Sequence, residues 1–176
     1  MSAVIEKLYP WRTTWVIERY QVDDPELMHL YCMGHLEPYD TSVIDGNIAL
    51  NTGKADILGI LIGTVTDLYN TTNARIGVGD SSTAEAATQT DLVASSNKAY
   101  ASMKTGYPQL GTTTTTNDTV LFQAEFGTSV ANYSWKEFVM KNNASSVCLN
   151  RKVSDQGTKA SGQIWTVTCK LQLVSA

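Results

Sequence analysis

One stretch of the chain carries the residue types that bind zinc. His29, Cys32 and His35 form the pattern H-x-x-C-x-x-H, and Glu37 and Asp40 follow closely. Zinc is held by imidazole, thiolate and carboxylate groups, and on a helix His29 and Cys32 would share a face, so that all three side chains reach one ion. Two surface histidines and one core thiol explain the same pattern. We therefore keep the three residues as a metal candidate but expect no metal and no cofactor.

The motifs expected of an enzyme are incomplete. Gly77-Val78-Gly79-Asp80 contains a G-x-G after a predicted strand, but Ser82 stands where a dinucleotide fingerprint requires its third glycine. Both histidines lie near residue 30 and no G-x-S-x-G elbow is present, so a serine triad lacks its parts. Carboxylate pairs such as Glu85 and Asp91 are expected by chance among 17 acidic residues. The sequence predicts a protein without catalytic activity.

Two groups of residues indicate contact with a partner. Tyr9, Trp11 and Trp15 lie near the start of the chain, where aromatic rings on an arm would dock onto a neighbouring subunit. Arg151 and Lys152, with Lys159 close behind, form a small basic patch suited to an acidic surface or to nucleic acid. A solvated strand edge, on which lysine prevents edge-to-edge pairing, explains that patch as well. The candidates for a partner interface are Tyr9, Trp11, Trp15, Arg151 and Lys152.

Composition restricts the class of protein. The 176 residues fit one domain, only 17% of them are charged, and 22 threonines favour β structure. A net charge of −4 argues against a nucleic-acid-binding protein. No apolar run reaches the roughly 18 residues of a membrane-spanning helix, and no secretory signal is present, so we expect no membrane partner. Three cysteines are too few for a disulfide scaffold.

Hydrophobic periodicity predicts the organisation of the chain. Residues 1–12 are interpreted as an extended arm and residues 13–176 as one β-rich domain, of which 13–45 is either a part or a small subdomain. Residues that favour β structure predict a strand at 13–20, and alternation of apolar and polar residues predicts strands at 120–126 and 165–173. Asp24-Pro25 marks a turn or a helix start, which leaves 26–33 ambiguous between helix and strand.

One helix is predicted with Asn51 or Thr52 as its N-cap and Gly63 at its C-terminal end. Its apolar stripe consists of Ala55, Ile57, Leu58, Leu61 and Ile62. Gly59 would allow that helix to pack closely on a sheet. The fold expected from these elements is mainly β: an antiparallel β-sandwich or small barrel with one packed α-helix and an extended N-terminal arm.

Nine runs of residues from 46 onward, in this order and spacing, resemble a family of small virion structural proteins of tailed bacteriophages. The runs are GNIALNTG (46–53), NARIGVGDSSTA (73–84), ATQTDL (87–92), GYP (106–108), FGTS (126–129), ANYSWKE (131–137), LNRKV (149–153), GTK (157–159) and WTVT (165–168). Residues 1–45 are less similar to that family.

The resemblance implies a virion protein without catalytic residues, assembled in the cytoplasm of a bacterial host. It implies most directly a capsid decoration protein that binds the major capsid protein, stabilises the outer shell and self-associates, with a homotrimer expected. A tail, fibre, collar or adaptor component that binds tail proteins is the alternative. A module that binds host glycans is the third hypothesis.

Overall fold

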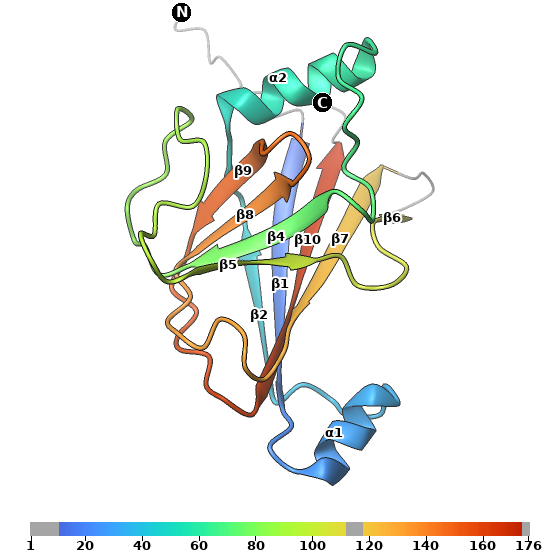
Figure 1. Ribbon diagram of the computed structural model, residues 1–176, viewed down its shortest axis with the longest axis vertical. Helices are drawn as coiled ribbons and strands as arrows, with labels where there is room; N and C mark the ends of the chain where they lie inside the picture. Colours follow the sequence, from blue (N-terminus) through green and yellow to red (C-terminus); the bar gives the residue numbers. More distant parts are fainter. Residues whose placement is uncertain (1–10, 112–117, 174–176) are drawn as a thin grey trace, which may run out of the picture.

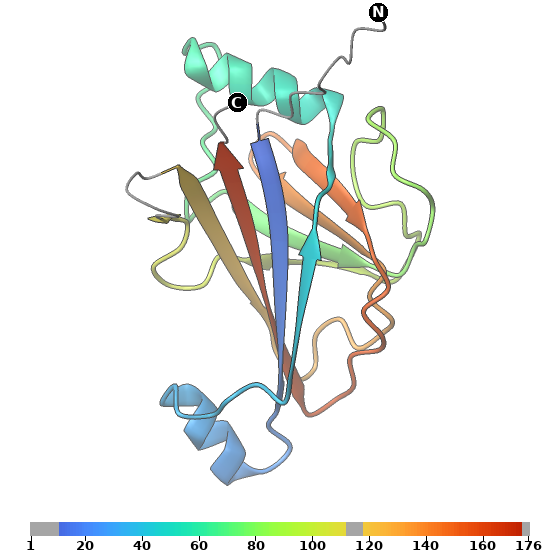
Figure 2. The same cartoon turned by 180° about the vertical axis from the view of Figure 1, so that it is seen from behind.

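The computed structural model describes residues 11–111 and 118–173, which form an antiparallel β-sandwich with two helices (Figures 1 and 2). Sheet A contains, in spatial order, β2 (Asp40–Asp45), β1 (Trp11–Gln21), β10 (Gln163–Leu173), β7 (Thr119–Phe126) and β6 (Gln109–Gly111). Sheet B contains β3 (Ile48–Ala49), β9 (Cys148–Val153), β8 (Glu137–Asn142), β4 (Ala74–Gly79) and β5 (Lys98–Ser102). The expected β-sandwich is confirmed.

The first strand lies inside sheet A rather than at its margin. β1 pairs with β10 over its whole length, from Trp11 opposite Leu173 to Gln21 opposite Gln163, and β2 covers its other side. The strands predicted at 13–20 and 165–173 are confirmed. The predicted arm was too long, because Trp11 and Arg12 belong to β1, and residues 1–10 lie outside the described residues. Since β1 and β2 are strands of sheet A, residues 13–45 are part of the sandwich.

Aromatic rings dominate the core between the sheets. The ring centroid of Trp135 lies 4.7 Å from that of Trp165 and 4.9 Å from that of Phe126, both in edge-to-face contact. Phe138 completes the group at 6.2 Å from Trp135, and the indole nitrogen of Trp135 donates a hydrogen bond to the carbonyl of Ala131. Because rings of this size bury large apolar areas, this cluster is the main source of stability in the sandwich.

Helix α1 (Pro25–Cys32) lies between β1 and β2 at one end of the sandwich, the lower end in Figure 1. The carboxylate of Asp24 caps it by accepting hydrogen bonds from the backbone N–H groups of Glu26 and Leu27, both at 2.9 Å. Pro25 occupies the first turn, where its missing N–H costs nothing. The ambiguous segment is therefore helical up to Cys32, and the described residues contain a second helix, which the sequence had left open.

Helix α2 (Asn51–Leu61) closes the opposite end of the sandwich, next to the start of β1 and the end of β10 (Figures 1 and 2). Ile57 packs against the main core, and Gly63, at φ 74°, terminates the helix as predicted. The N-cap position is held by Leu50, without a side-chain hydrogen bond, so the predicted caps Asn51 and Thr52 were wrong. Neither described helix is long and apolar enough to cross a membrane.

Close approach of α2 to sheet B depends on Gly53. A Cβ atom at this position would lie 2.5 Å from Cα of Leu149 on β9, which is far inside a normal contact distance. The sequence had assigned this role to Gly59, but a Cβ atom there would meet the side chain of Val65 in the segment after the helix, at 2.6 Å. The glycine that lets the helix pack on the sheet is therefore Gly53.

Gly53→Ala is expected to lower the free energy of unfolding by about 1–3 kcal/mol, because the clash with β9 forces backbone shifts. Helix propensity alone would favour alanine by about 1 kcal/mol, so the two effects have opposite signs. Urea unfolding measures the difference, with Thr52→Ala at the neighbouring exposed position as the control. A Gly53→Ala variant as stable as the control would show that α2 does not rest on β9 in this way.

The long segment 80–97 covers the outer face of sheet B. It carries no helix or strand, yet Leu92 within it is buried against Val139 and Cys148 of the sheet, in a small second apolar cluster with Leu50. A segment of this length without regular structure must satisfy its backbone polar groups through side chains of the layer beneath it. The residues that do so are Glu137 and Arg151, which are described below.

Candidate interaction surface

The three candidate zinc ligands lie at the α1 end of the molecule. His29 and Cys32 occupy the last turn of α1, but the helix ends at Cys32 and His35 lies beyond it. Within residues 11–111 and 118–173, no group of three or more His, Cys, Asp or Glu side chains is placed to hold a metal ion. The structure therefore does not bring the candidate triplet together, because the helix is about one turn too short.

The aromatic interface candidates are divided between the core and the start of the chain. Trp15 is fully buried inside the sandwich, with its ring centroid 5.9 Å from that of Phe138, so its assignment to a partner interface was wrong. Inward and outward side chains alternate along β1, and Trp15 falls on the inward side. Trp11 begins β1 with only its backbone described, and Tyr9 lies outside the described residues.

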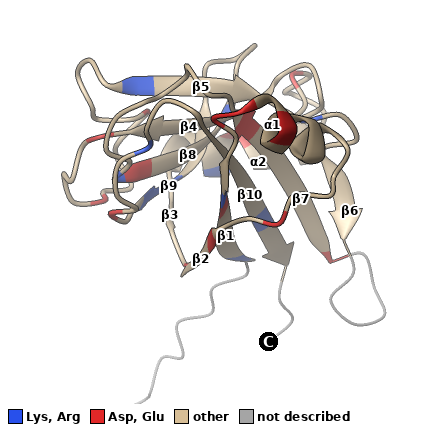
Figure 3. Ribbon diagram, turned by 90° about the horizontal axis from the view of Figure 1, so that it is seen from below, with Lys and Arg blue, Asp and Glu red and all other residues tan. Residues whose placement is uncertain are grey.

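Of the two basic interface candidates, one is buried and one is partly exposed. Arg151 is fully buried and forms an ion pair with the equally buried Glu137, with 2.7 Å between Nη2 and Oε2, so it does not belong to a surface patch. Lys152, the next residue on β9, is half-buried and is left as a lone candidate. Seen from below in Figure 3, basic and acidic residues lie interspersed over the elements. The expected basic patch is therefore reduced to Lys152, because Lys159 is fully buried as well.

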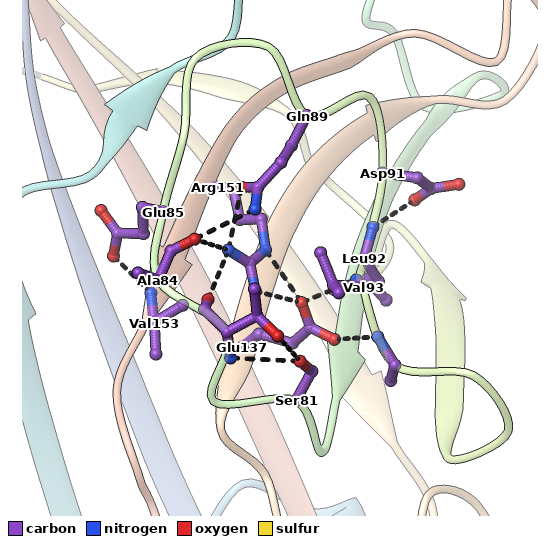
Figure 4. Close-up of polar contacts among 12 residues, drawn as sticks. Ser81, Ala84, Glu85, Gln89, Asp91, Leu92, Val93, Glu137, Arg151 and Val153 are labelled. Atoms are coloured by element: carbon purple, nitrogen blue, oxygen red, sulfur yellow. Dashed lines mark hydrogen bonds and ion pairs between the residues drawn. The ribbon is translucent and has the colours of Figure 1, made fainter.

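Glu137 and Arg151 hold the segment 80–97 on sheet B (Figure 4). The carboxylate of Glu137 accepts hydrogen bonds from the backbone N–H groups of Val93 at 2.9 Å and Ala94 at 2.7 Å. Arg151 donates through Nη1 to the carbonyl of Thr83 and to Oε1 of Gln89, each at 3.0 Å. The two charges are thus neutralised by each other and by backbone groups that would otherwise be buried without partners.

Asp91 lies within the same segment and ties it to β5 and β8. Its carboxylate binds Nζ of Lys141 and the hydroxyl of Tyr100, each at 2.6 Å. Burial acts to raise the pKa of Asp91, but these hydrogen bonds outweigh it, and the pKa is lowered. A glycosidase acid would need the opposite shift. Burial also raises the pKa of the Cys148 thiol beside it, which keeps the sulfur protonated and unreactive.

Lys159 is a buried cation that connects two loops at the α1 end. It is fully buried, and its Nζ donates hydrogen bonds to the carbonyl of Gly127 and to Oδ1 of Asn132, both at 2.7 Å. Burial lowers its pKa from 10.5 to about 8. The amine thus anchors the loop after β7 to the loop before β10, although burial destabilises its charged form.

The lowered pKa of Lys159 in the folded state predicts that the stability of the protein depends on pH. Below about pH 8 Lys159 is charged in both states, and between pH 8 and 10.5 only the unfolded state keeps the proton. The unfolded state then binds more protons, so stability rises with pH in this window. Compared with Lys159→Met, the wild type should gain about 1–2 kcal/mol between pH 7 and pH 9.5. Urea unfolding at the two pH values measures this gain; the exposed variant Lys98→Met should change in parallel with the wild type.

The exposed apolar residues of α2 form the most distinct surface feature of the described residues. Leu58, Leu61 and Ile62 are 62%, 79% and 73% exposed and lie on one side of the helix and its C-cap. We call them the α2 apolar face. The sequence predicted this stripe. The buried side of the helix, however, consists of small and polar residues with partly buried Ile57.

The signal that could have shown the orientation is the spacing of Gly53, Asp56 and Gly59. Residues three apart lie close together on a helix, and these three are the buried residues of α2. A side made of glycines allows the helix to approach another backbone closely, which leaves the leucines on the outside.

Comparison of the chain with protein-family models, with curated proteins and with solved structures found no match.

Proposed function

We propose that the protein is a non-enzymatic structural component of a tailed-phage virion. Its most specific assignment is a capsid decoration protein that binds the outer shell, self-associates and stabilises the assembled particle. The proposal rests on the resemblance of the nine runs in the sequence and on what the residues in those runs do in the fold.

The observation that carries the proposal is that these runs supply the buried contacts of the sandwich. Gly53 allows α2 to approach β9, Arg151 and Glu137 hold the segment 80–97, and Lys159 binds Asn132. Trp135 and Trp165 of the same runs form the aromatic core. The charged side chains in these runs thus stabilise the fold through buried contacts. A rigid small domain suits a protein that works by binding a large assembly.

Shell binding is the property to test first. Purified protein is mixed with shells that lack it and sedimented, and the bound amount is measured against added protein. We expect saturable binding and a higher temperature of shell disruption, since a ligand of the assembled state stabilises that state by mass action. Shells already carrying the protein are the control and should bind no more. Binding to isolated tails and not to shells would favour the tail component instead.

A further inference from the structure

We propose that the α2 apolar face is the docking site of the chain's own N-terminal segment, residues 1–10, in the same molecule. The face carries three large apolar side chains that the described residues leave uncovered. Burying one such side chain stabilises a protein by about 1.5–3 kcal/mol, so a covering segment has a substantial gain available.

The position of β1 places the N-terminal segment next to this face. β1 begins at Trp11, paired with Leu173 at the end of β10, and both ends lie beneath α2 in Figures 1 and 2. Ten residues span at most about 33–36 Å. An 11-residue helix is only about 16 Å long. The segment is therefore long enough to turn back and cross the outer side of α2.

The residues of the segment suit such a face. Val4, Ile5, Leu8 and Tyr9 are apolar, and the charges of Glu6 and Lys7 between them cancel. A tethered segment also has an effective concentration in the millimolar range for a site within its reach, so occupation by the same molecule is favoured over a second copy in dilute solution. The docking does not depend on the proposed virion role.

Cross-linking between paired cysteines tests the contact in the full-length protein. Cys32 is exposed and is first replaced by serine, while Cys148 and Cys169 are buried, with raised thiol pKa values. Leu8→Cys is then combined with Leu61→Cys on the α2 apolar face, and a short bismaleimide is added. The matched control combines Leu8→Cys with Glu26→Cys on α1. Glu26 follows β1, an 11-residue strand about 36 Å long, and therefore lies at the opposite end of the sandwich from α2.

We expect cross-linking within one chain at several-fold higher yield for the Leu61 pair than for the Glu26 pair, independent of protein concentration. Mass spectrometry of the linked peptides identifies the product. Equal yields for the two pairs would overturn the proposal. Linkage only between two chains, rising with concentration, would also overturn it and would make a second copy the occupant.

Hydrogen exchange provides a second readout that does not require reactive thiols. Replacing Val4, Ile5 and Leu8 by serine should accelerate amide exchange in residues 51–62 several-fold, because the helix loses its cover, while exchange in β10 stays unchanged. Unchanged exchange in α2 would count against docking.

Discussion

Arg151→Met is expected to lower the free energy of unfolding by about 3–5 kcal/mol, because it leaves the Glu137 carboxylate buried without its counter-charge. Both side chains are fully buried, and Nε and Nη2 of Arg151 lie 2.9 and 2.7 Å from Oε2 of Glu137. The substitution also removes the donor to the carbonyl of Thr83. Chemical denaturation measures the loss, and hydrogen exchange should show the segment 80–97 opening first.

The matched control is Arg12→Met, which removes an exposed arginine from β1 and is expected to change stability by less than about 0.5 kcal/mol. The double variant Arg151→Met/Glu137→Gln removes both charges and keeps an acceptor for the N–H groups of Val93 and Ala94. It should be less destabilised than the sum of the single variants, by about 1–3 kcal/mol. If Arg151→Met costs no more than Arg12→Met, the ion pair does not hold this segment.

Trp135→Ala is the second large effect, with an expected loss of about 3–5 kcal/mol. The ring is fully buried at the centre of the aromatic cluster, and its removal leaves a cavity that Phe126, Phe138 and Trp165 cannot close, since they are positioned by three different strands. The carbonyl of Ala131 also loses its indole donor. Thermal and urea unfolding measure the change.

Leu110→Ala serves as the control for size and hydrophobicity. Leu110 is 63% exposed on β6, away from the α2 apolar face, so its truncation removes little buried area and should cost well under about 1 kcal/mol. The comparison separates the loss of a buried core ring from the loss of apolar volume in general. Equal losses for the two variants would contradict the assignment of Trp135 to the centre of the core.

The strands and helix ends that could be predicted are those specified by neighbouring residues. Alternation along 165–173 marks β10, Asp24 with Pro25 marks the start of α1, and Gly63 marks the end of α2. Each of these signals is local: side chains alternate across a strand, a carboxylate caps the N–H groups two and three residues ahead, and glycine adopts a positive φ.

The predictions that failed depend on contacts between distant segments. Arg151 was assigned to the surface because its charge suggested solvent, but Glu137 lies 14 residues away and becomes its partner only when β8 and β9 pair. Trp15 was assigned to a partner interface because it follows Tyr9 and Trp11 near the start of the chain, but it becomes buried when β1 joins sheet A and the two sheets pack together.

The side of α2 that packs on the sheet does not follow from its apolar stripe. Its apolar stripe was detected correctly, and amphipathic helices normally bury such a stripe. Here the opposite side packs on the sheet, because Gly53 permits a backbone approach that a side chain would prevent. Periodicity reports which residues share a side of a helix. It does not report which side the rest of the chain will cover.

The copy number of the protein in purified tailed-phage particles tests the proposed virion role most directly. Quantitative mass spectrometry gives its ratio to the major capsid protein. A decoration protein predicts a ratio near one or a simple fraction of it, because its sites repeat with the shell lattice. A ratio far below that, as for a component of the tail or of a unique vertex, would contradict the capsid assignment, and absence from the particle would contradict the virion role altogether.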